Sequence, residues 1–472
     1  MNTKKFIGLV LIAFSLQAMG QTTMTLKQCV ETGINNNFDV KQRELQLQSD
    51  EANWKQSRLN IFPDLNANAG HSFNQGRSID PFTNSPVTQS FNSSSYSAGS
   101  GITLFNGLSI QNSIRQNSLA FQASKMDWQQ EKDNLTINII LAYLQVLSNA
   151  EQLEQAKNQA TLSKQQVERL EILNKEGAIK PSDLSDLKGQ YASDQLSIIS
   201  IQNLLETAKI NLCQLMNIPY NKDLVLEKID PASFADRYEG TPDKIYQTAL
   251  EQLAMIKAAE LRKQSAAKAI KVARGQLFPV LRFEGGVSTS YSSVAMQNKY
   301  LNTTDKTSND YVLINGTPSP VIYKQDNFSS SKINYNDQLN NNLYTSFGFN
   351  LRIPIFNSLQ QRNRIKQAQI IYKTRELSAN TTKTQLSQAI DQAYINMNTA
   401  SNRYKTILEQ VNAFNESFRA AGIRFDSGVG NSIDYLTAKN NLDRASINLI
   451  IAKYDYVLRT KILDYYQGKQ LW

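Results

Sequence analysis

The segment LYTSFGFNLRIPI, residues 343–355, is the most informative about the fold class of this chain, because its side chains alternate between apolar and polar. A two-residue period is typical of a β-strand that has one face against apolar surroundings and the other against water. About ten alternating residues also match the length of a tilted strand that crosses an outer membrane. Three other segments alternate in the same way, two of them more faintly: Leu281–Tyr291, Leu65–Phe73 and Ser95–Phe105.

Four strands are too few to close a β-barrel, since bacterial barrels have about eight strands or more. In lipid, an open sheet edge leaves backbone N–H and C=O groups without partners, at a cost of several kcal/mol each. If these segments lie in a membrane, several copies of the chain must therefore share one barrel. The alternative is a soluble antiparallel sheet that is half covered by helices.

The chain contains an internal duplication. Residues Thr25–Ser72 match Thr241–Ser288 at a constant offset of 216, and a second block matches at an offset of 251, as in Ala142-Tyr143 and Ala393-Tyr394. The offsets differ by 35 residues, and this excess falls in a polar stretch rich in Asn, Ser, Thr and Tyr. We therefore expect two copies of one unit, the second with a longer loop at about residues 293–342.

Each copy reads helix, strand, loop, strand, long helix, short turn and helix. The long helices are expected at about Gly107–Gly177 and Asn357–Ser427, 71 residues each, or about 105 Å at 1.5 Å per residue. The two shorter helices of each copy together match its long helix in length, which predicts a tube or rod. These shorter helices are expected at Thr25–Asn60, Asp183–Asn217, Thr241–Gln276 and Ser432–Gly468.

Apolar residues recur at a 4-3 spacing along the long helices. In the second copy the row runs from Leu386 to Phe425, and every position is apolar or Tyr. In the first copy it runs from Leu135 to Leu170 and includes Asn149 and Ser163. A sustained 3.5-residue repeat predicts coiled-coil packing with a left-handed supercoil. The core of an ordinary helical bundle is the alternative.

The composition excludes several classes of protein. The 472 residues include one histidine, His71, and two cysteines, Cys29 and Cys213, too few for a multi-bridge disulfide framework or a zinc site of four Cys and His ligands. The net charge of +9 is spread along the helices without a dense basic cluster, so we expect no nucleic-acid partner. We find no catalytic constellation, and we expect no enzyme activity, cofactor or metal.

The cysteines are expected to be buried thiols, which pack as small apolar residues. A disulfide between Cys29 and Cys213 is the alternative, because an exported protein meets oxidising conditions. His71 falls on the apolar side of its strand near a loop, and we expect a rim residue there rather than a ligand or a base.

Residues 1–20, MNTKKFIGLVLIAFSLQAMG, place two lysines before an apolar run and small residues before a cleavage site. This pattern is typical of a secretory signal peptide, with an uncleaved anchor as the alternative. No later segment has the roughly 18 consecutive apolar residues expected of a transmembrane helix. The mature chain is therefore expected in the periplasm or, as β-structure, in an outer membrane.

Together these features resemble the TolC-like outer-membrane efflux channel family, over nearly the whole mature chain. Two positions depart from the family's pattern. Thr103 in the first copy replaces the proline at the strand exit, and Ser358 in the second copy stands where the family often has glycine. Both departures weaken local capping. The resemblance depends on the duplication, on the order of the elements, and on these motifs: Phe-Pro-x-Leu at 62–65 and 278–281, Ile-Pro-Ile-Phe-Asn at 353–357, and glycine six residues before aspartate at Gly177/Asp183 and Gly428/Asp434.

The resemblance implies a mainly helical fold with β-structure. It implies a homotrimer with four strands per chain in a shared twelve-stranded β-barrel, surrounded by outer-membrane lipid, and long coiled-coil helices in a periplasmic α-barrel. The expected organisation is a signal peptide at 1–20, a first repeat at 21–217, an equatorial linker at 218–240 and a second repeat at 241–472.

For function, the resemblance implies a passive exit duct in the cell outer membrane, with a long periplasmic extension. Small molecules or proteins would reach it from an inner-membrane pump of the RND or ABC type, through a periplasmic membrane-fusion adaptor. Tripartite efflux and type I secretion both fit this description. A soluble periplasmic coiled-coil adaptor or scaffold is the alternative function.

In this family, aspartates just after the tip turn form a ring that narrows the periplasmic entrance. The matching positions are Asp434, Thr437 where a second aspartate often occurs, and Asp183 and Asp186 in the first copy. A ring of carboxylates would concentrate cations. The alternative is that each aspartate only complements the positive end of a helix dipole.

The tip turns themselves are the expected docking surface for the adaptor, with turn formation alone as the alternative. The residues concerned are Gly177, Ala178, Ile179, Gly428 and Val429.

Overall fold

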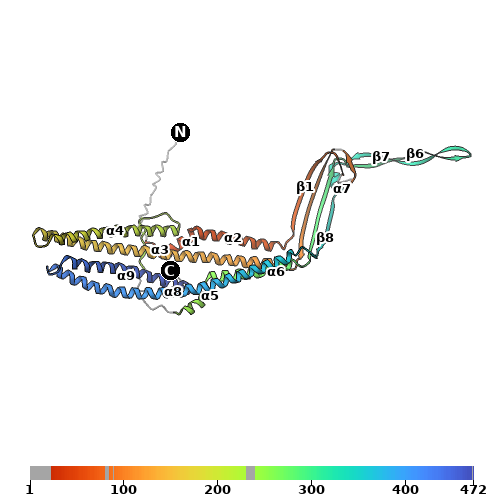
Figure 1. Ribbon diagram of the computed structural model, residues 1–472. Helices are drawn as coiled ribbons and strands as arrows, with labels where there is room; N and C mark the ends of the chain where they lie inside the picture. Colours follow the sequence, from red (N-terminus) through yellow and green to blue (C-terminus); the bar gives the residue numbers. More distant parts are fainter. Residues whose placement is uncertain (1–22, 80–83, 89, 230–239, 470, 472) are drawn as a thin grey trace, which may run out of the picture. The chain divides into compact units, whose positions relative to one another are not determined.

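The computed structural model describes residues 23–79, 84–88, 90–229, 240–469 and 471. The chain divides into two compact units (Figure 1). The signal peptide expected at 1–20 and residues 230–239 of the expected linker lie outside the described residues. The helical unit comprises Met1–Ala52, Ser118–Ser265 and Lys373–Trp472, and the sheet unit comprises Asn53–Asn117 and Ala266–Tyr372.

The two long helices are unbroken, as predicted. Helices α3 (Ser109–Lys175) and α8 (Gln360–Asp426) have 67 residues each. Each begins later than expected because the two residues before it have positive φ, a left-handed conformation that cannot continue a right-handed helix. Helices α4 (Pro181–Met216) and α9 (Ser432–Tyr466) follow them after short turns and run alongside them (Figure 1).

The first helix of each copy is broken in two, which corrects the prediction of single helices. The breaks fall at Asn37 and Leu253, which lie 216 residues apart and are therefore equivalent in the duplication. Both residues have extended backbone, with ψ of 133°. The four helices that result are α1 (Leu26–Asn36), α2 (Phe38–Leu59), α5 (Pro242–Gln252) and α6 (Ala254–Gly275).

Side-chain hydrogen bonds and burial hold these breaks in place. The Asn37 side-chain oxygen accepts the backbone N–H groups of Asp39 and Val40, at 2.9 and 3.3 Å, and so caps α2. At the equivalent position Leu253 is buried in the core between α5, α8 and α9. The helical periodicity of the sequence continues through both positions, which is why it predicts one helix.

The four predicted strands form one antiparallel sheet in the order β1-β4-β5-β8. The pairing of β4 with β5 joins the first copy to the second. The last strand ends at Arg352, before the expected end at Ile355, because Pro354 has no N–H to donate to a neighbouring strand. The bounds are β1 (Asp64–Asn74), β4 (Phe91–Phe105), β5 (Val280–Ser292) and β8 (Tyr344–Arg352), with a small separate pair of β2 (Arg77–Ile79) and β3 (Pro86–Thr88).

The longer loop expected at about 293–342 connects β5 to β8, and much of it is regular structure. Strands β6 (Met296–Ile314) and β7 (Thr317–Lys332) form a hairpin, and helix α7 (Tyr335–Asn341) follows it. Asn315 and Gly316 connect the strands with φ of 54° and 82°, the paired positive values of a type I′ turn. The polar composition of the segment hides this hairpin, although its Asn-Gly pair is a turn signal.

The core of the helical unit lies between the long and short helices. The 4-3 row of the first copy is buried along most of its length, while that of the second copy is buried from Leu386 to Ala400 and half-buried from Tyr404 to Phe418. Cys29 and Cys213 are both buried free thiols, as predicted, and burial raises the pKa of Cys29 to about 12.

One pair of equivalent positions allows a direct test of local strain. Ser358 has φ of 53°, and its counterpart in the first copy is Gly107, with φ of 65°. A left-handed conformation costs a non-glycine residue about 1–2 kcal/mol. We expect Ser358→Gly to stabilise the detergent-solubilised protein by about 1 kcal/mol, measured as a higher midpoint of thermal unfolding.

The reverse exchange, Gly107→Ser, is the matched control and should lower the midpoint. A Cβ added at Gly107 would lie 2.3 Å from the carbonyl oxygen of Gly275. A shift in the same direction for both variants would contradict this explanation.

Candidate functional site

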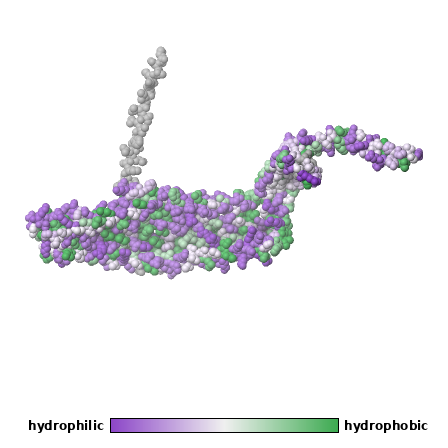
Figure 2. All heavy atoms as spheres, turned by 45° about the horizontal axis from the view of Figure 1, so that its top comes forward, coloured by the Kyte–Doolittle hydropathy of each residue, from purple (hydrophilic) through white to green (hydrophobic). Residues whose placement is uncertain are grey.

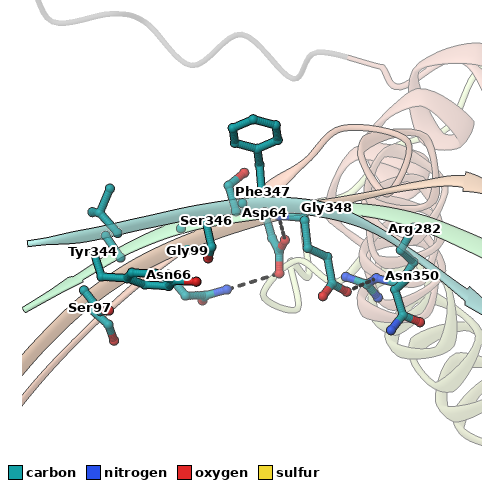
Figure 3. Close-up of a pocket in the computed structure, with 18 of the residues that line it drawn as sticks. Asp64, Asn66, Ser97, Gly99, Arg282, Tyr344, Ser346, Phe347, Gly348 and Asn350 are labelled. Atoms are coloured by element: carbon teal, nitrogen blue, oxygen red, sulfur yellow. Dashed lines mark hydrogen bonds and ion pairs between the residues drawn. The ribbon is translucent and has the colours of Figure 1, made fainter.

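One face of the four-stranded sheet is polar and hollow (Figure 3). Glycines in the middle strands contribute no side chains, so the face forms a hollow of about 730 Å³. The strand register sets neighbouring residues in rows across the four strands: Asp64, Gly101, Glu284 and Gly348; Asn66, Gly99, Gly286 and Ser346; and Asn68, Ser97, Ser288 and Tyr344.

One ion pair and two hydrogen bonds hold charged groups on this polar face. The Asp64 carboxylate accepts the backbone N–H of Gly101 at 3.0 Å and the side-chain amide of Asn66 at 3.1 Å. Arg282 Nε lies 2.9 Å from Glu284 Oε1 (Figure 3). The result is a hydrophilic wall, which suits contact with water and dissolved solutes.

The opposite face of the sheet is apolar and exposed. Phe347 points to the side away from Asp64 and Asn66 (Figure 3). Large exposed apolar patches are unusual on soluble proteins and mark contact with lipid or protein. His71 shares this face, as its place in the alternation predicts, and its Nδ1 lies 2.9 Å from Ser94 Oγ. The apolar residues on this face include Leu65, Phe73, Val287, Phe347, Phe349 and Leu351, all of them exposed.

The two tip turns lie at the same end of the helical unit (Figure 1). Gly177 and Gly428 have φ of 68° and 75°, the left-handed conformation that ends many helices. The next residue of each turn, Ala178 or Val429, donates its N–H to a carbonyl five residues earlier, at 2.9 and 3.0 Å. Arg169 of α3 joins the turns by an ion pair with Asp426 at the end of α8.

The predicted docking residues divide into two groups. Gly177, Ala178, Gly428 and Val429 are exposed, and Val429 is 81% exposed. Ile179 is half-buried and packs against the cluster of apolar residues beneath the turns. Its side chain contributes to the core of the tip rather than to its outer surface.

The predicted gate residues fall into two groups: Asp183 and Asp186 contact a buried serine, whereas Asp434 and Thr437 are exposed. The Ser432 hydroxyl, 2% exposed, lies 3.0 Å from Asp183 Oδ1 and 2.9 Å from Asp186 Oδ2, and so links α9 to α4. A hydroxyl has one proton, so it can donate to only one of these carboxylates at a time. Asp434 and Thr437 lie three residues apart on α9, and both are exposed.

A buried ion-pair network lies further along the same helices, and sequence reasoning missed it. Lys439 of α9 is 1% exposed, and its Nζ lies 3.0 Å from Asp194 of α4 and 2.6 Å from Asp443 of α9. Ser163 and Gln190 also donate to the Asp194 carboxylate. Burial raises the pKa of Asp443, although Lys439 opposes this effect.

An aromatic cluster lies between this network and the tip turns. Tyr435 is buried, with its ring centroid 5.4 Å from that of Phe418 and 5.0 Å from that of Phe425. Val167 of α3 and Leu187 of α4 belong to the same cluster. Tyr435 therefore holds α9 against the three other helices, and burial raises its pKa to about 12.

The comparison with known families decides the assignment. A family model described as "Outer membrane efflux protein" matches residues 30–217 and 245–464. This chain belongs to the outer membrane efflux protein family. The resemblance inferred from the duplication and its motifs is therefore confirmed.

Relatives of this efflux protein agree in fold. The chain is 20% identical to the outer membrane protein TolC of Vibrio cholerae over 405 residues. This alignment covers 85% of this chain and 81% of the relative. The solved structure of CusC superposes with a TM-score of 0.76 at 16% identity, over 94% of this chain and 92% of that one. The outer membrane protein VceC of Vibrio cholerae gives 0.74 at 14% identity, over 95% and 97%. The mainly helical, duplicated fold is thus that of outer-membrane efflux channels.

Within the described part of the efflux protein, no helix is both long and apolar enough to span a membrane. In the same residues, no group of three or more His, Cys, Asp and Glu side chains could hold a metal ion.

The buried network makes a prediction about stability. Lys439→Met would leave the carboxylates of Asp194 and Asp443 buried without a cation, and we expect it to cost about 3–5 kcal/mol. Chemical denaturation of the solubilised protein, followed by circular dichroism, measures this loss.

Asp443→Asn is the matched control. Because burial raises its pKa, Asp443 binds a proton more readily in the folded chain, so this group lowers stability as the pH rises from 3.8. The asparagine variant keeps the ion pair of Lys439 with Asp194, so we expect only a small change in the free energy of unfolding at pH 7. Between acidic and neutral pH, the stability of this variant should fall less than that of the unmodified protein. Equal losses in both variants would rule out the charge explanation.

Proposed function

We propose that three copies of this chain form a passive exit channel in the cell outer membrane. The four-stranded sheet carries this proposal, because one of its faces is polar and hollow and the other is apolar and exposed. In the described residues β1 pairs only with β4, and β8 only with β5. Pairing β1 of one copy with β8 of the next removes both open edges, and such head-to-tail contacts close into a ring. Three copies would give a twelve-stranded barrel.

The helical unit supports the same assembly. Large apolar side chains remain exposed along its helices, and Figure 2 shows them as green patches among purple polar residues. Contact with neighbouring copies in a periplasmic α-barrel would bury them. Examples are Leu196, Ile199 and Leu204 of α4, and Leu377, Ile395 and Leu408 of α8.

The location and partners follow from this assembly. The TolC and VceC relatives are named outer membrane proteins, and residues 1–20 carry the pattern of an export signal. We assign the chain a membrane barrel and a long periplasmic extension, with repeats at 21–217 and 241–472 and an equatorial linker at 218–240. Its tips would meet a membrane-fusion adaptor and an inner-membrane pump of the RND or ABC type, in tripartite efflux or type I secretion.

At the tips we assign two different roles. Asp183 and Asp186 bind the Ser432 hydroxyl, which positions them to hold α9 against α4 in a closed entrance. Asp434 and Thr437 are exposed and would face the corresponding residues of the other copies around the entrance.

The assembly itself is tested by the mass of the detergent-solubilised protein. We expect three chains, each of 53.2 kDa less the mass of the signal peptide, together with single-channel conductance in planar bilayers. A folded monomer that is soluble without detergent would instead support a periplasmic adaptor or scaffold.

Removing the carboxylates at Asp434 should weaken cation binding at the entrance. We expect Asp434→Asn to reduce block by a trivalent cation added to the tip side about tenfold, which corresponds to ~1.4 kcal/mol of lost attraction. The measurement is single-channel conductance, and Glu31→Gln on α1 is the control. Unchanged block in the aspartate variant would exclude the ring.

A charged residue on the exposed tip should prevent docking without closing the channel. We expect Val429→Arg to abolish export in cells, while the trimer and its conductance persist, because the apolar contact surface is lost. Asp434→Asn is the converse control and should retain adaptor binding in a pull-down. Normal export by Val429→Arg would remove this turn from the docking surface.

A further inference from the structure

The β6–β7 hairpin is a feature of the sheet unit that the proposed channel does not use. The β2–β3 pair occupies the equivalent place in the first repeat, but its strands have three residues each, whereas β6 has 19 and β7 has 16. Among the described residues, β6 and β7 pair only with each other (Figure 1). Most of the surface of this ribbon is therefore open to its surroundings.

The base of the hairpin is fixed to one end of the sheet. Gln338 of α7 is buried, and its side-chain oxygen accepts the backbone N–H of Ser292, the last residue of β5, at 2.9 Å. Its side-chain nitrogen donates to the carbonyl oxygens of Ser292 and Ile333 at 3.0 and 2.9 Å. Because β5 follows α6 in the chain and ends at Ser292, the hairpin starts from the end of the sheet away from α6. In the proposed channel this is the external end.

The hairpin changes in composition along its length. Its stem, residues 296–310 and 324–332, has seven charged side chains, whereas residues 311–323, YVLINGTPSPVIY, have none. The charged residues Asp310 and Lys324 directly flank this uncharged segment on the two strands. We call residues 311–323 the apolar tip.

The apolar tip is apolar on both of its faces. Leu313 of one face is 63% exposed, and Val312 of the other is 55% exposed. Contact with a flat protein surface would cover one face and leave the other in water. Surroundings that enclose the ribbon would bury both faces, and a lipid layer does so. The register sets Tyr311, Leu313, Pro318, Pro320 and Ile322 on one face, and Val312, Ile314, Val321 and Tyr323 on the other.

The backbone at the outer edge of β7 also suits lipid. Pairs along an antiparallel ladder alternate between hydrogen-bonded and non-hydrogen-bonded, and proline is tolerated where the N–H would point away from the partner strand. Pro318 and Pro320 occupy two such alternate positions, opposite Leu313 and Tyr311. At these positions β7 has no unpaired N–H group, which reduces the cost of leaving water. The missing donors also disfavour addition of another strand.

The boundaries of the apolar tip match those of a lipid interface. Tyr311 and Tyr323 are its first and last residues, and tyrosine is enriched at the level of lipid headgroups. The charges of Asp310 and Lys324 come next on each strand, where the ribbon would return to water.

We propose that the apolar tip inserts into the interfacial layer of the outer leaflet of the membrane that holds the barrel. This inference rests on the channel proposed above. A depth of about 5–10 Å would bring Leu313 and Ile314 to the acyl boundary and leave the two tyrosines among the headgroups. At this depth water and headgroup oxygens still reach the backbone of the apex turn, Asn315 and Gly316, which would lack partners in the hydrocarbon core.

The stem is long enough to reach this lipid. Residues 296–310 span about 50 Å at 3.3 Å per residue, and they start at the external end of the sheet. The register shifts between Tyr300 and Asn302 and between Thr307 and Tyr311 are irregularities of the kind that bend a strand. The nearest lipid within this reach is the outer leaflet around the same barrel.

Fluorescence quenching in nanodiscs tests the inference on the full chain. Leu313→Cys and Val312→Cys place a thiol on each face of the apolar tip, and each is labelled with a small fluorophore. Leu301→Cys is the matched control, because Leu301 lies on the stem and is 60% exposed. The native thiols of Cys29 and Cys213 are buried and stay in place. In nanodiscs of phosphatidylethanolamine and phosphatidylglycerol with brominated acyl chains, we expect strong quenching at both tip positions and little at Leu301.

A second arrangement identifies the source of the lipid. Trimers in nanodiscs of plain lipid are mixed with vesicles of the brominated lipid. Quenching in this arrangement alone would assign the apolar tip to a different membrane, and quenching at only one tip position would indicate a contact through one face. Equal quenching at Leu301 would show that the tip is not distinguished from the stem. Each of these results would overturn the inference.

A charge on the apolar tip should remove it from the lipid. With the fluorophore at Val312→Cys, we expect Leu313→Asp to lower the ratio of inserted to free tip about tenfold, because the burial of a leucine side chain is lost and a carboxylate resists desolvation. Leu301→Asp is the control and should leave this ratio unchanged. An unchanged ratio in Leu313→Asp would also overturn the inference.

The mass and conductance of the same samples separate this inference from the channel itself. A chain that does not form trimers in nanodiscs would overturn both proposals. Conducting trimers without quenching at the apolar tip would overturn only the lipid contact. Protection of the Leu313→Cys thiol from a water-soluble maleimide in whole cells would then point to a protein partner.

Discussion

Backbone hydrogen bonding between β4 and β5 joins the two repeats into one sheet, and the other features of the sheet unit depend on it. The register sets Gly99 beside Gly286 and Ala98 beside Val287, so polar and apolar positions of both repeats fall on matching faces. A slip of one residue would reverse the faces of one half of the sheet relative to the other. β4 and β5 can approach this closely because residue 286 is glycine. A Cβ at this position would lie 2.9 Å from the carbonyl oxygen of Ala98.

This pairing also determines where the sheet remains incomplete. The pairing uses the edges of β4 and β5 that face each other, so β1 and β8 are the edge strands of the sheet. An outer strand in water can hydrogen-bond to solvent, but in lipid it must find another strand. In the proposed membrane barrel, the need for further copies would therefore follow from the same hydrogen bonds that unite the repeats.

The tips of the helical unit combine strong packing with buried charge. The cluster around Tyr435 excludes water, and the network of Lys439 with Asp194 and Asp443 satisfies charges that apolar packing could not. Buried ion pairs of this kind add little net stability but penalise any arrangement that separates them. They therefore favour one relative position of α9 and α4 over others of similar apolar contact.

The duplication, the four alternating strands and the approximate length of the long helices could all be predicted from the sequence, because periodicity and repetition are local properties of the chain. The sequence could not place the helix breaks at Asn37 and Leu253, whose extended backbone depends on capping and on burial by other elements. Nor could it distinguish the buried Lys439 from a solvated partner of Asp443, since the same four-residue spacing serves both. These features depend on burial, which a residue acquires from its neighbours on folding, so they could be seen only in the folded chain.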